Sequence, residues 1–437
     1  MQIAPMRSIG TVALVLAMPG LIPASSTAGE WRDQELRLHP EKGYTLQQTL
    51  ALHQRFDLAT WNSGNDIDFS RFAYLNTSPF FPHAWIPRAG QVAKLESTSD
   101  PQIGETKAKT AEGEMTLDEW TAGHLDGVIV VHNGKIIYER YPRMRPTDRY
   151  IWWSVSKSVA GTIVGLLEEQ GQIDVSKPIQ TYLPKLANSE WSGTPVIDIL
   201  DHASGMTGLE ADDPDAYTDP QSPYGLFEAS LGIQPKPPKT LTPTYDYITT
   251  LKRQKPSGKR FEYTSVNTFV TAWLAETVTG RSYPELVGEM IWQRMGAEAD
   301  ALLAMSPEGA PGAHGLLNTT LRDLARYGML FTKSWTIVAK EKVIPDSLIQ
   351  KIQQDGRAYL YEAGMLKPKL DDYLGEAAAF QTRQWDFVMK DGDFGKSGFH
   401  GQTLYVSPSK NLVVASFATG KGYDTWSFAR TIAKSLK

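Results

Sequence analysis

The stretch WWSVSKSV at residues 152–159 determines the fold class that we expect for the whole chain. From Val159 onward apolar residues recur at helical spacing, so the sequence predicts an amphipathic helix that begins here. Residues three apart share one helix face, which brings the Ser154 hydroxyl within hydrogen-bond reach of the Lys157 amine. A partly desolvated amine has a lowered pKa and can remove the serine proton, so the two residues are a candidate Ser–Lys nucleophile.

A second S-x-x-K match, SPSK at residues 407–410, provides an internal comparison. It contains a proline and lies between two β-like runs, 403–406 and 412–415, so we expect it to form a hairpin turn. The alternative interpretation of Ser154 is a structural one, because serine is also a favoured N-cap residue at the start of a helix. The short motif by itself does not separate the two interpretations.

Composition excludes several functional classes. A chain of 437 residues is long enough for two or three structural units. The net charge of −5 gives no basic footprint, so nucleic acid is not an expected partner. The absence of cysteine excludes disulfides, zinc–thiolate sites and cysteine nucleophiles. With a serine as the candidate nucleophile, we expect chemistry that needs neither a metal nor another cofactor.

The first residues have the pattern of an export signal. Arg7 precedes an apolar run from 9 to 24, and small residues follow at 26–28. We interpret residues 1–28 as a secretory signal peptide, and expect a periplasmic or secreted protein. An uncleaved membrane anchor is the alternative.

Strand signals occur at both ends of the remaining chain. Two β-branched runs flank Asn-Gly within residues 128–138, which is a strong hairpin signal. Strands at 402–406 and 412–417 and a helix at 423–435 close the chain. We expect one antiparallel sheet built from both ends, with a helical insert between them. The expected units are an irregular N-terminal extension at 29–120, an α/β domain at 121–175 and 330–437, and an inserted helical subdomain at 176–329.

Three motifs follow one another along the chain: Ser154-x-x-Lys157, a tyrosine motif at Tyr263, and a glycine-containing motif at residues 396–398. With these, the chain resembles the serine β-lactamase-like hydrolases, which include penicillin-binding proteins, class C β-lactamases and related esterases. Four stretches resemble the 6-aminohexanoate-dimer hydrolase branch of that superfamily, namely residues 153–158, 263–268, 296–301 and 400–402.

The resemblance implies a mixed α/β fold, an antiparallel sheet flanked by helices, with the site between the sheet and the inserted helical subdomain. It also implies that Ser154 is the acylated nucleophile and Lys157 its partner. Tyr263 matches the tyrosine that assists proton transfer, as base in acylation or as acid to the leaving amine. The structural alternative for Tyr263 is a buried tyrosine that precedes a helix.

The motif Lys396-Ser397-Gly398 matches the K-T-G strand of the family. The resemblance implies that the N–H of the next residue, Phe399, forms an oxyanion hole together with the N–H of Ser154. The alternative is an exposed basic turn.

Four further residues lie in or near these motifs. Class C enzymes carry an asparagine two residues after the tyrosine, where this chain has Ser265, and Asn267 follows two positions later. Either residue could face the substrate. His400 lies close to the strand motif, and His202 is expected to be a structural, hydrogen-bonded histidine.

An acidic loop follows Gly205. It could attract a cationic amine, although a run of this kind is more often solvated. Its members are Glu210, Asp212, Asp213, Asp215, Tyr217 and Asp219.

The function predicted from these features is that of an exported serine hydrolase that cleaves amide or ester bonds of small linear molecules through an acyl-enzyme on Ser154. The alternatives are a β-lactamase or D-Ala-D-Ala carboxypeptidase, and a non-catalytic protein that binds cell-wall peptides. The expected partner is a small-molecule amide or ester, and the sequence leaves a homodimer open.

Overall fold

The computed structural model describes residues 39–63, 66–207, 210, 216–217, 219–236, 243–420 and 422–436. These residues belong to one compact unit, His39–Lys437. The expected signal peptide, residues 1–28, lies outside them. Within the described ranges, no helix combines the length and apolar character that a membrane span requires.

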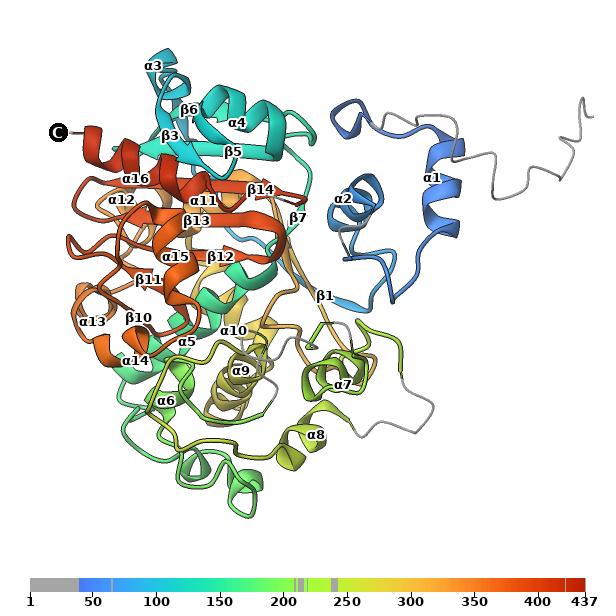
Figure 1. The fold of residues 1–437 in the computed structure, drawn as a ribbon, viewed down its shortest axis with the longest axis vertical. Helices are drawn as coiled ribbons and strands as arrows, with labels where there is room; N and C mark the ends of the chain where they lie inside the picture. Colours follow the sequence, from blue (N-terminus) through green and yellow to red (C-terminus); the bar gives the residue numbers. More distant parts are fainter. Residues whose placement is uncertain are drawn as a thin grey trace, which may run out of the picture. The chain divides into compact units, whose positions relative to one another are not determined.

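The centre of this unit is an eight-stranded sheet (Figure 1). All neighbouring strands are antiparallel except β2 and β6, which are parallel. The strands, in spatial order, are β10 (Phe380–Thr382), β11 (Trp385–Val388), β12 (Phe394–Gly398), β13 (Gln402–Ser407), β14 (Leu412–Ala418), β5 (Leu125–His132), β6 (Lys135–Arg140) and β2 (Glu96–Ser97). Strands from the two ends of the chain meet where β14 pairs with β5. This confirms the expected single sheet.

Two hairpins form where the sequence predicts them. Asn133 and Gly134 connect β5 to β6 with φ angles of 50° and 76°, as a two-residue hairpin turn requires. The connection between β13 and β14 contains residues 408–411. The second S-x-x-K match is therefore part of a hairpin.

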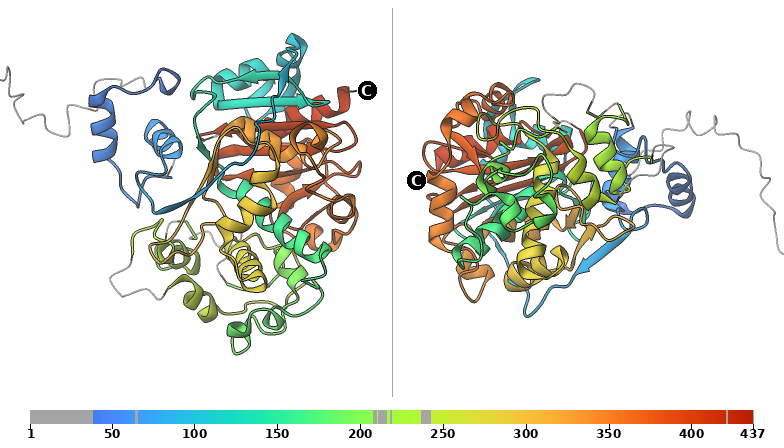
Figure 2. Two further views of the ribbon diagram at one scale, coloured as in Figure 1. Left: turned by 180° about the vertical axis from the view of Figure 1, so that it is seen from behind. Right: turned by 90° about the horizontal axis from the view of Figure 1, so that it is seen from below.

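Helices cover both faces of the large sheet (Figures 1 and 2). The helix α16 (Thr425–Ser435) and the helix α4 (Leu117–His124) share an apolar core with one face, to which Val128 and Val414 contribute. On the other face lies α11 (Leu321–Met329), where a Cβ on Gly328 would be 2.7 Å from Val413 Cγ1. Alternate residues of β14 thus point to opposite helical layers.

The helix that carries the S-x-x-K motif is more deeply buried than the sequence predicts. A 3₁₀ turn, η3 (Trp153–Ser156), leads into α5 (Lys157–Glu169), and every residue from 157 to 167 is buried. The prediction of an amphipathic helix is therefore wrong: α5 is a central helix, packed against the helix α9 (Ser265–Thr279). A glycine with a positive φ angle follows the end of each helix, Gly171 at 71° and Gly280 at 67°, as is common where a helix ends.

The described part of the N-terminal region is regular, which differs from the expected irregular extension. Its strand β1 pairs with β8 from the insert. Its α-helices have side-chain caps, which in α1 and α4 are capping boxes at Thr45 and Gln48 and at Thr116 and Glu119. Its elements are η2 (Pro40–Lys42), α1 (Leu46–Gln54), α2 (Ile67–Leu75), β1 (His83–Ile86), β2, α3 (Pro101–Gly104), β3 (Lys107–Thr110), β4 (Gly113–Thr116) and α4.

The insert is mainly helical, but it also contributes to a four-stranded sheet of order β1-β8-β9-β7. The strands that complete this sheet are β7 (Tyr150–Ile151), β8 (Ala301–Ala304) and β9 (Leu317–Thr319). The remaining helices of the insert are η4 (Ile179–Thr181), η5 (Pro184–Leu186), α6 (Val196–Leu200), α7 (Pro223–Ser230), α8 (Thr244–Thr250), α10 (Tyr283–Met290) and η6 (Trp292–Arg294). Four more helices, α12 (Trp335–Val338), α13 (Asp346–Gln354), α14 (Ala358–Glu362) and α15 (Lys367–Leu374), lead into the C-terminal strands.

Candidate active site

Ser154 and Lys157 meet at the junction of η3 and α5. The Lys157 Nζ atom lies 2.9 Å from Ser154 Oγ, 2.8 Å from Ser265 Oγ and 2.9 Å from the carbonyl oxygen of His314. Burial lowers the pKa of Lys157 to about 7, against the opposing effect of the Glu210 carboxylate. A large fraction of this amine is therefore neutral near pH 7 and can accept the proton of the Ser154 hydroxyl.

Tyr263, which precedes α9, lies between two lysines. Its ring centroid is 5.1 Å from Lys157 Nζ and 5.0 Å from Lys396 Nζ, and its hydroxyl accepts a hydrogen bond of 3.3 Å from Lys396. Burial raises the pKa of Tyr263 well above 10, and the Asp386 and Glu210 carboxylates raise it further. The phenol is therefore protonated at neutral pH, which suits a proton donor and not a phenolate base.

His202 contacts the ring of Tyr263. The two rings stack with centroids 5.0 Å apart. Burial lowers the pKa of His202 well below 6.5, and the nearby cations Lys157 and Lys396 lower it further, so the imidazole is neutral. This agrees with the structural role expected for His202.

The strand motif is buried on β12 and is not an exposed turn. Lys396 donates hydrogen bonds to Asp386 Oδ1 at 2.6 Å and to the Ser397 carbonyl at 2.9 Å, besides the bond to Tyr263. Ser397 donates from its N–H and its hydroxyl to Asp386 Oδ2, at 2.8 and 2.7 Å. Asp386, on the neighbouring strand β11, therefore fixes both polar residues of the motif.

Gly398 brings the end of β12 against the residues that precede the nucleophile. A Cβ on Gly398 would lie 2.4 Å from the carbonyl oxygen of Trp152, so only glycine allows this approach. Phe399 begins a second 3₁₀ turn, η7 (Phe399–Gly401), as Trp153 begins η3. Backbone N–H groups in a first helical turn lack helical acceptors, which leaves those of Ser154 and Phe399 suited to an oxyanion hole.

Ser265 faces Lys157, and Asn267 does not. The Ser265 hydroxyl accepts from Lys157 and donates to Glu210 Oε1 at 3.0 Å, whereas Asn267 Oδ1 accepts from Ser204 Oγ at 2.7 Å. The structure thus connects lysine, serine and glutamate in one hydrogen-bonded chain.

Other candidates from the sequence lie outside the catalytic cluster. The His400 ring nitrogen Nε2 is 3.1 Å from the Asn62 carbonyl, and burial lowers the pKa of His400. Asp219 Oδ1 accepts from the backbone of Gln221 in a turn, at 2.8 Å. Three members of the expected acidic loop, Asp212, Asp213 and Asp215, lie outside the described residues.

Glu210 was expected in a solvated loop or as a receptor for an amine. Instead it is buried and accepts hydrogen bonds from the Ser265 N–H and hydroxyl and from the Tyr217 hydroxyl, the last at 3.2 Å. Its charge supports the protonated form of Lys157.

Sequence reasoning missed several residues of the site. Asp386 is a single acid in the apolar strand Trp385–Val388, and a lone carboxylate in such a strand is a signal that could have drawn attention to it. His314 Nε2 lies 2.9 Å from Glu228 Oε1, buried beside the carbonyl that orients Lys157, and no motif marks this contact.

The N-terminal region reaches the site through Trp61. This buried indole stacks on Trp153 with centroids 5.1 Å apart and donates from Nε1 to the Ile233 carbonyl at 3.1 Å. Trp153 has a φ angle of 45°, which is unusual for a residue with a side chain. The packing of Trp61 therefore helps to hold the backbone immediately before Ser154.

The catalytic cluster opens into a cavity of about 290 Å³. Its lining is aromatic and apolar with a few charges: Ser154, Glu210, Tyr217, Tyr263, Leu366, Lys369, Leu370, Tyr373, Asp386, Ser397, Gly398, Phe399 and Tyr423. Among the residues that the structure describes, no three histidine or carboxylate side chains are grouped so that they could hold a metal ion.

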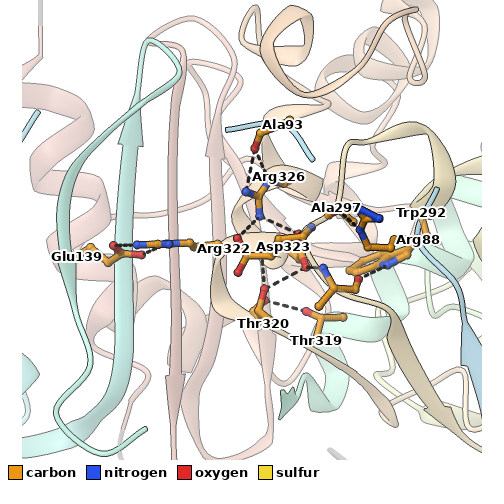
Figure 3. Close-up of polar contacts among 12 residues, drawn as sticks. Arg88, Ala93, Glu139, Trp292, Ala297, Thr319, Thr320, Arg322, Asp323 and Arg326 are labelled. Carbon is orange, nitrogen blue, oxygen red and sulfur yellow. Dashed lines mark hydrogen bonds and ion pairs between the residues drawn. The ribbon is translucent and has the colours of Figure 1, made fainter. Parts of the chain in front are cut away.

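The stretch 296–301 belongs to the scaffold (Figure 3). Asp323 of α11 accepts hydrogen bonds from the backbone N–H groups of Glu298 and Ala299 at 2.9 and 3.1 Å, and also binds Arg326. Arg88 Nε donates to the Ala297 carbonyl at 3.1 Å. This part of the resemblance therefore reflects how the segment 296–301 is fixed to α11 and not contact with a substrate.

Known proteins resemble this chain in sequence and in fold. The beta-lactamase family matches residues 117–433. The chain belongs to the beta-lactamase family. Within it, a 6-aminohexanoate-dimer hydrolase from Paenarthrobacter ureafaciens is 28% identical over 372 residues, which cover 84% of this chain and 89% of that protein.

Solved structures confirm the fold. A candidate 6-aminohexanoate-dimer hydrolase from Bacillus anthracis superposes with a TM-score of 0.73 at 22% identity, covering 87% of this chain and 96% of that chain. A candidate beta-lactamase from Bacteroides dorei superposes with a TM-score of 0.55 at 18% identity, covering 73% of this chain and 96% of that chain. This beta-lactamase family member is thus a serine hydrolase with a β-lactamase/transpeptidase-like fold.

Proposed function

We propose that this protein is an exported serine hydrolase that cleaves amide or ester bonds of small linear substrates through an acyl-enzyme on Ser154. The observation that carries the proposal is the contact of 2.9 Å between Ser154 Oγ and a fully buried Lys157 amine whose pKa is lowered to about 7. Such an amine can act as the base that a serine nucleophile needs.

In acylation, Ser154 Oγ bonds to the substrate carbonyl carbon while its proton passes to the neutral Lys157 amine. The carbonyl oxygen becomes an oxyanion that the N–H groups of Ser154 and Phe399 can bind. The bond to the leaving group then breaks. Tyr263, held as a neutral phenol between the two lysines, is suited to pass its proton to the departing amine while it takes up the proton that Lys157 received from Ser154, so both Tyr263 and Lys157 are neutral again before deacylation.

In deacylation, a water molecule attacks the ester on Ser154. Its proton goes to the neutral amine of Lys157, and the bond between Ser154 Oγ and the acyl carbon breaks to release the acid. Ser154 recovers its proton, so the cycle needs no group besides those of this chain and water.

A linear substrate is supported by two observations. The relative from Paenarthrobacter ureafaciens is named for a linear amide, the 6-aminohexanoate dimer. The cavity walls carry leucines and tyrosines, which suit an extended aliphatic chain. Export is supported by the apolar run and small residues of the first 28 positions, and cleavage after about residue 28 should appear in the intact mass of protein recovered from a periplasmic fraction.

Steady-state kinetics on three substrates test the proposal. We expect turnover of a p-nitrophenyl ester and of the linear 6-aminohexanoate dimer with kcat/KM above that for nitrocefin, and loss of all turnover in Ser154→Ala. A kcat/KM for nitrocefin above both other values would instead identify a β-lactamase. Absence of turnover on all three substrates would favour the non-catalytic alternative.

A further inference from the structure

The two buried lysines of the site have no donor left for a substrate. An ammonium group has three N–H donors. Lys157 uses its three on Ser154, Ser265 and the His314 carbonyl. Lys396 likewise has three acceptors, at Asp386, Tyr263 and the Ser397 carbonyl. An anionic substrate group must therefore find another cation.

Lys369 differs from these two lysines in its exposure and in its contacts. It lies on α15, lines the cavity and is exposed. Its amine is 5.9 Å from the ring centroid of Tyr373 and 5.8 Å from that of Tyr423, and these two rings stack at 5.2 Å. In the described part of the chain, Lys369 makes no hydrogen bond or ion pair with a side chain, whereas its neighbour Lys367 pairs with Asp371 at 2.6 Å.

The other charges of the cavity favour a carboxylate at Lys369 and not elsewhere. Glu210 and Asp386 are both cavity-lining carboxylates, and their hydrogen bonds hold them to Ser265 and to Lys396. A second carboxylate placed next to them would be repelled. Leu366 and Leu370 of α15 also line the cavity, so an aliphatic chain can lie along apolar wall beside the cation.

We propose that Lys369 is a specificity-determining residue that binds a carboxylate at one end of a linear amide or ester substrate. The chemistry that suits this subsite is a carboxylate at one end of an aliphatic chain, next to the apolar wall of α15. The two tyrosine rings hold the amine at the cavity by cation–π contact while its N–H donors stay available. This proposal rests on the proposed hydrolase function.

Two matched substrate pairs test the role of Lys369. One pair is mono-p-nitrophenyl adipate and its methyl ester, which differ by a charge on the acyl half. The other is the linear 6-aminohexanoate dimer and its C-terminal amide, which differ by a charge on the leaving half. For each protein variant, the measured quantity is the ratio of kcat/KM for the acid to kcat/KM for its neutral partner.

We expect Lys369→Gln to lower this ratio by about 5- to 20-fold in at least one pair, mainly through KM, because a charge-assisted hydrogen bond in ground state and transition state alike is lost. Lys369→Glu should lower it further, Lys369→Arg should retain it, and added salt should weaken the preference of the wild-type protein. The matched control is Lys340→Gln, which removes the same charge from an exposed lysine outside the cavity and should leave the ratio unchanged.

A ratio that stays the same in Lys369→Gln for both pairs, in a protein that turns over the neutral ester, would overturn the subsite and leave the hydrolase function standing. Failure of the wild-type protein to cleave any of the four compounds would overturn the hydrolase function itself and the subsite with it.

Discussion

The chain contains the S-x-x-K spacing twice, and the two copies have different surroundings. At 154–157 the serine lies in a 3₁₀ turn and the lysine begins a buried helix, so the amine reaches the hydroxyl at 2.9 Å. At 407–410 the serine ends strand β13, and Lys410 reaches instead to the carbonyl oxygen of Leu436, at 2.9 Å. The spacing becomes a reactive pair only where helical geometry places both side chains on one face.

Burial is the second difference between the two copies. The Lys157 amine is surrounded by neutral acceptors and has a pKa lowered to about 7. Lys410 is only partly buried, on the turn that joins β13 to β14. In the proposed mechanism, desolvation of the lysine, and not the S-x-x-K spacing alone, is what allows Lys157 to act as a base.

Of the substitutions considered, replacing the two serines should give the largest difference in kcat between the two copies. We expect Ser154→Ala to lower kcat by about 10⁴-fold or more, because the nucleophile is lost, and Ser407→Ala to leave kcat within about twofold. Turnover of a p-nitrophenyl ester measures both, with circular dichroism to check that each variant is folded. Comparable losses in the two variants would remove the distinction between the copies.

Replacing the two lysines extends the comparison. Lys157→Ala should lower kcat by about 10²–10⁴-fold with little change in KM, since it removes the general base, whereas Lys410→Ala should leave kcat unchanged. The double variant Ser154→Ala/Lys157→Ala should be no slower than Ser154→Ala alone, because the two residues act as a unit. Additive losses would contradict that account.

Tyr263 contacts the first copy through Lys157, so replacing it tests how much the surroundings of that copy contribute to turnover. We expect Tyr263→Phe to lower kcat by about 10²-fold with a small effect on KM, because proton transfer to the leaving group is impaired. The loss should be greater for an amide than for a p-nitrophenyl ester, whose leaving group needs no proton. Near-full turnover of both substrates would make Tyr263 structural.

The smallest expected effect is a shift in the pH dependence of kcat/KM. Only the neutral amine of Lys157 accepts a proton, so kcat/KM should rise with pH through an inflection near its pKa of about 7 and then level. The Glu210 carboxylate raises that pKa, so Glu210→Gln should move the inflection to lower pH. A pH–rate profile with a stable ester measures both. An inflection that moves to higher pH in Glu210→Gln would contradict the role of the Glu210 charge in raising the pKa of Lys157.

Local signals in the sequence predicted much of the fold. The Asn-Gly hairpin and the strands on either side of residues 408–411 depend on nearby residues alone, and both are confirmed. The burial of α5 was not predicted, because Gly161 and Gly165 fit against Arg383 and Leu348, which lie far along the chain. Spacing does not reveal such contacts.

The site shows the same division. Ser154, Lys157, Tyr263 and residues 396–398 were found because each lies in a short motif. Asp386, Glu210 and Trp61 take part through contacts that form only in the folded chain, as when Trp61 stacks on Trp153. Their positions depend on tertiary packing, which local sequence patterns do not reveal.

The most direct test of the central claim is to map the site of reaction of a fluorophosphonate. The wild-type protein is incubated with the probe, and peptide mass spectrometry locates the adduct. We predict one adduct, on Ser154, that forms faster as pH rises through about 7 and is absent from Ser154→Ala. An adduct on Ser407, or labelling that persists in Ser154→Ala, would contradict the account.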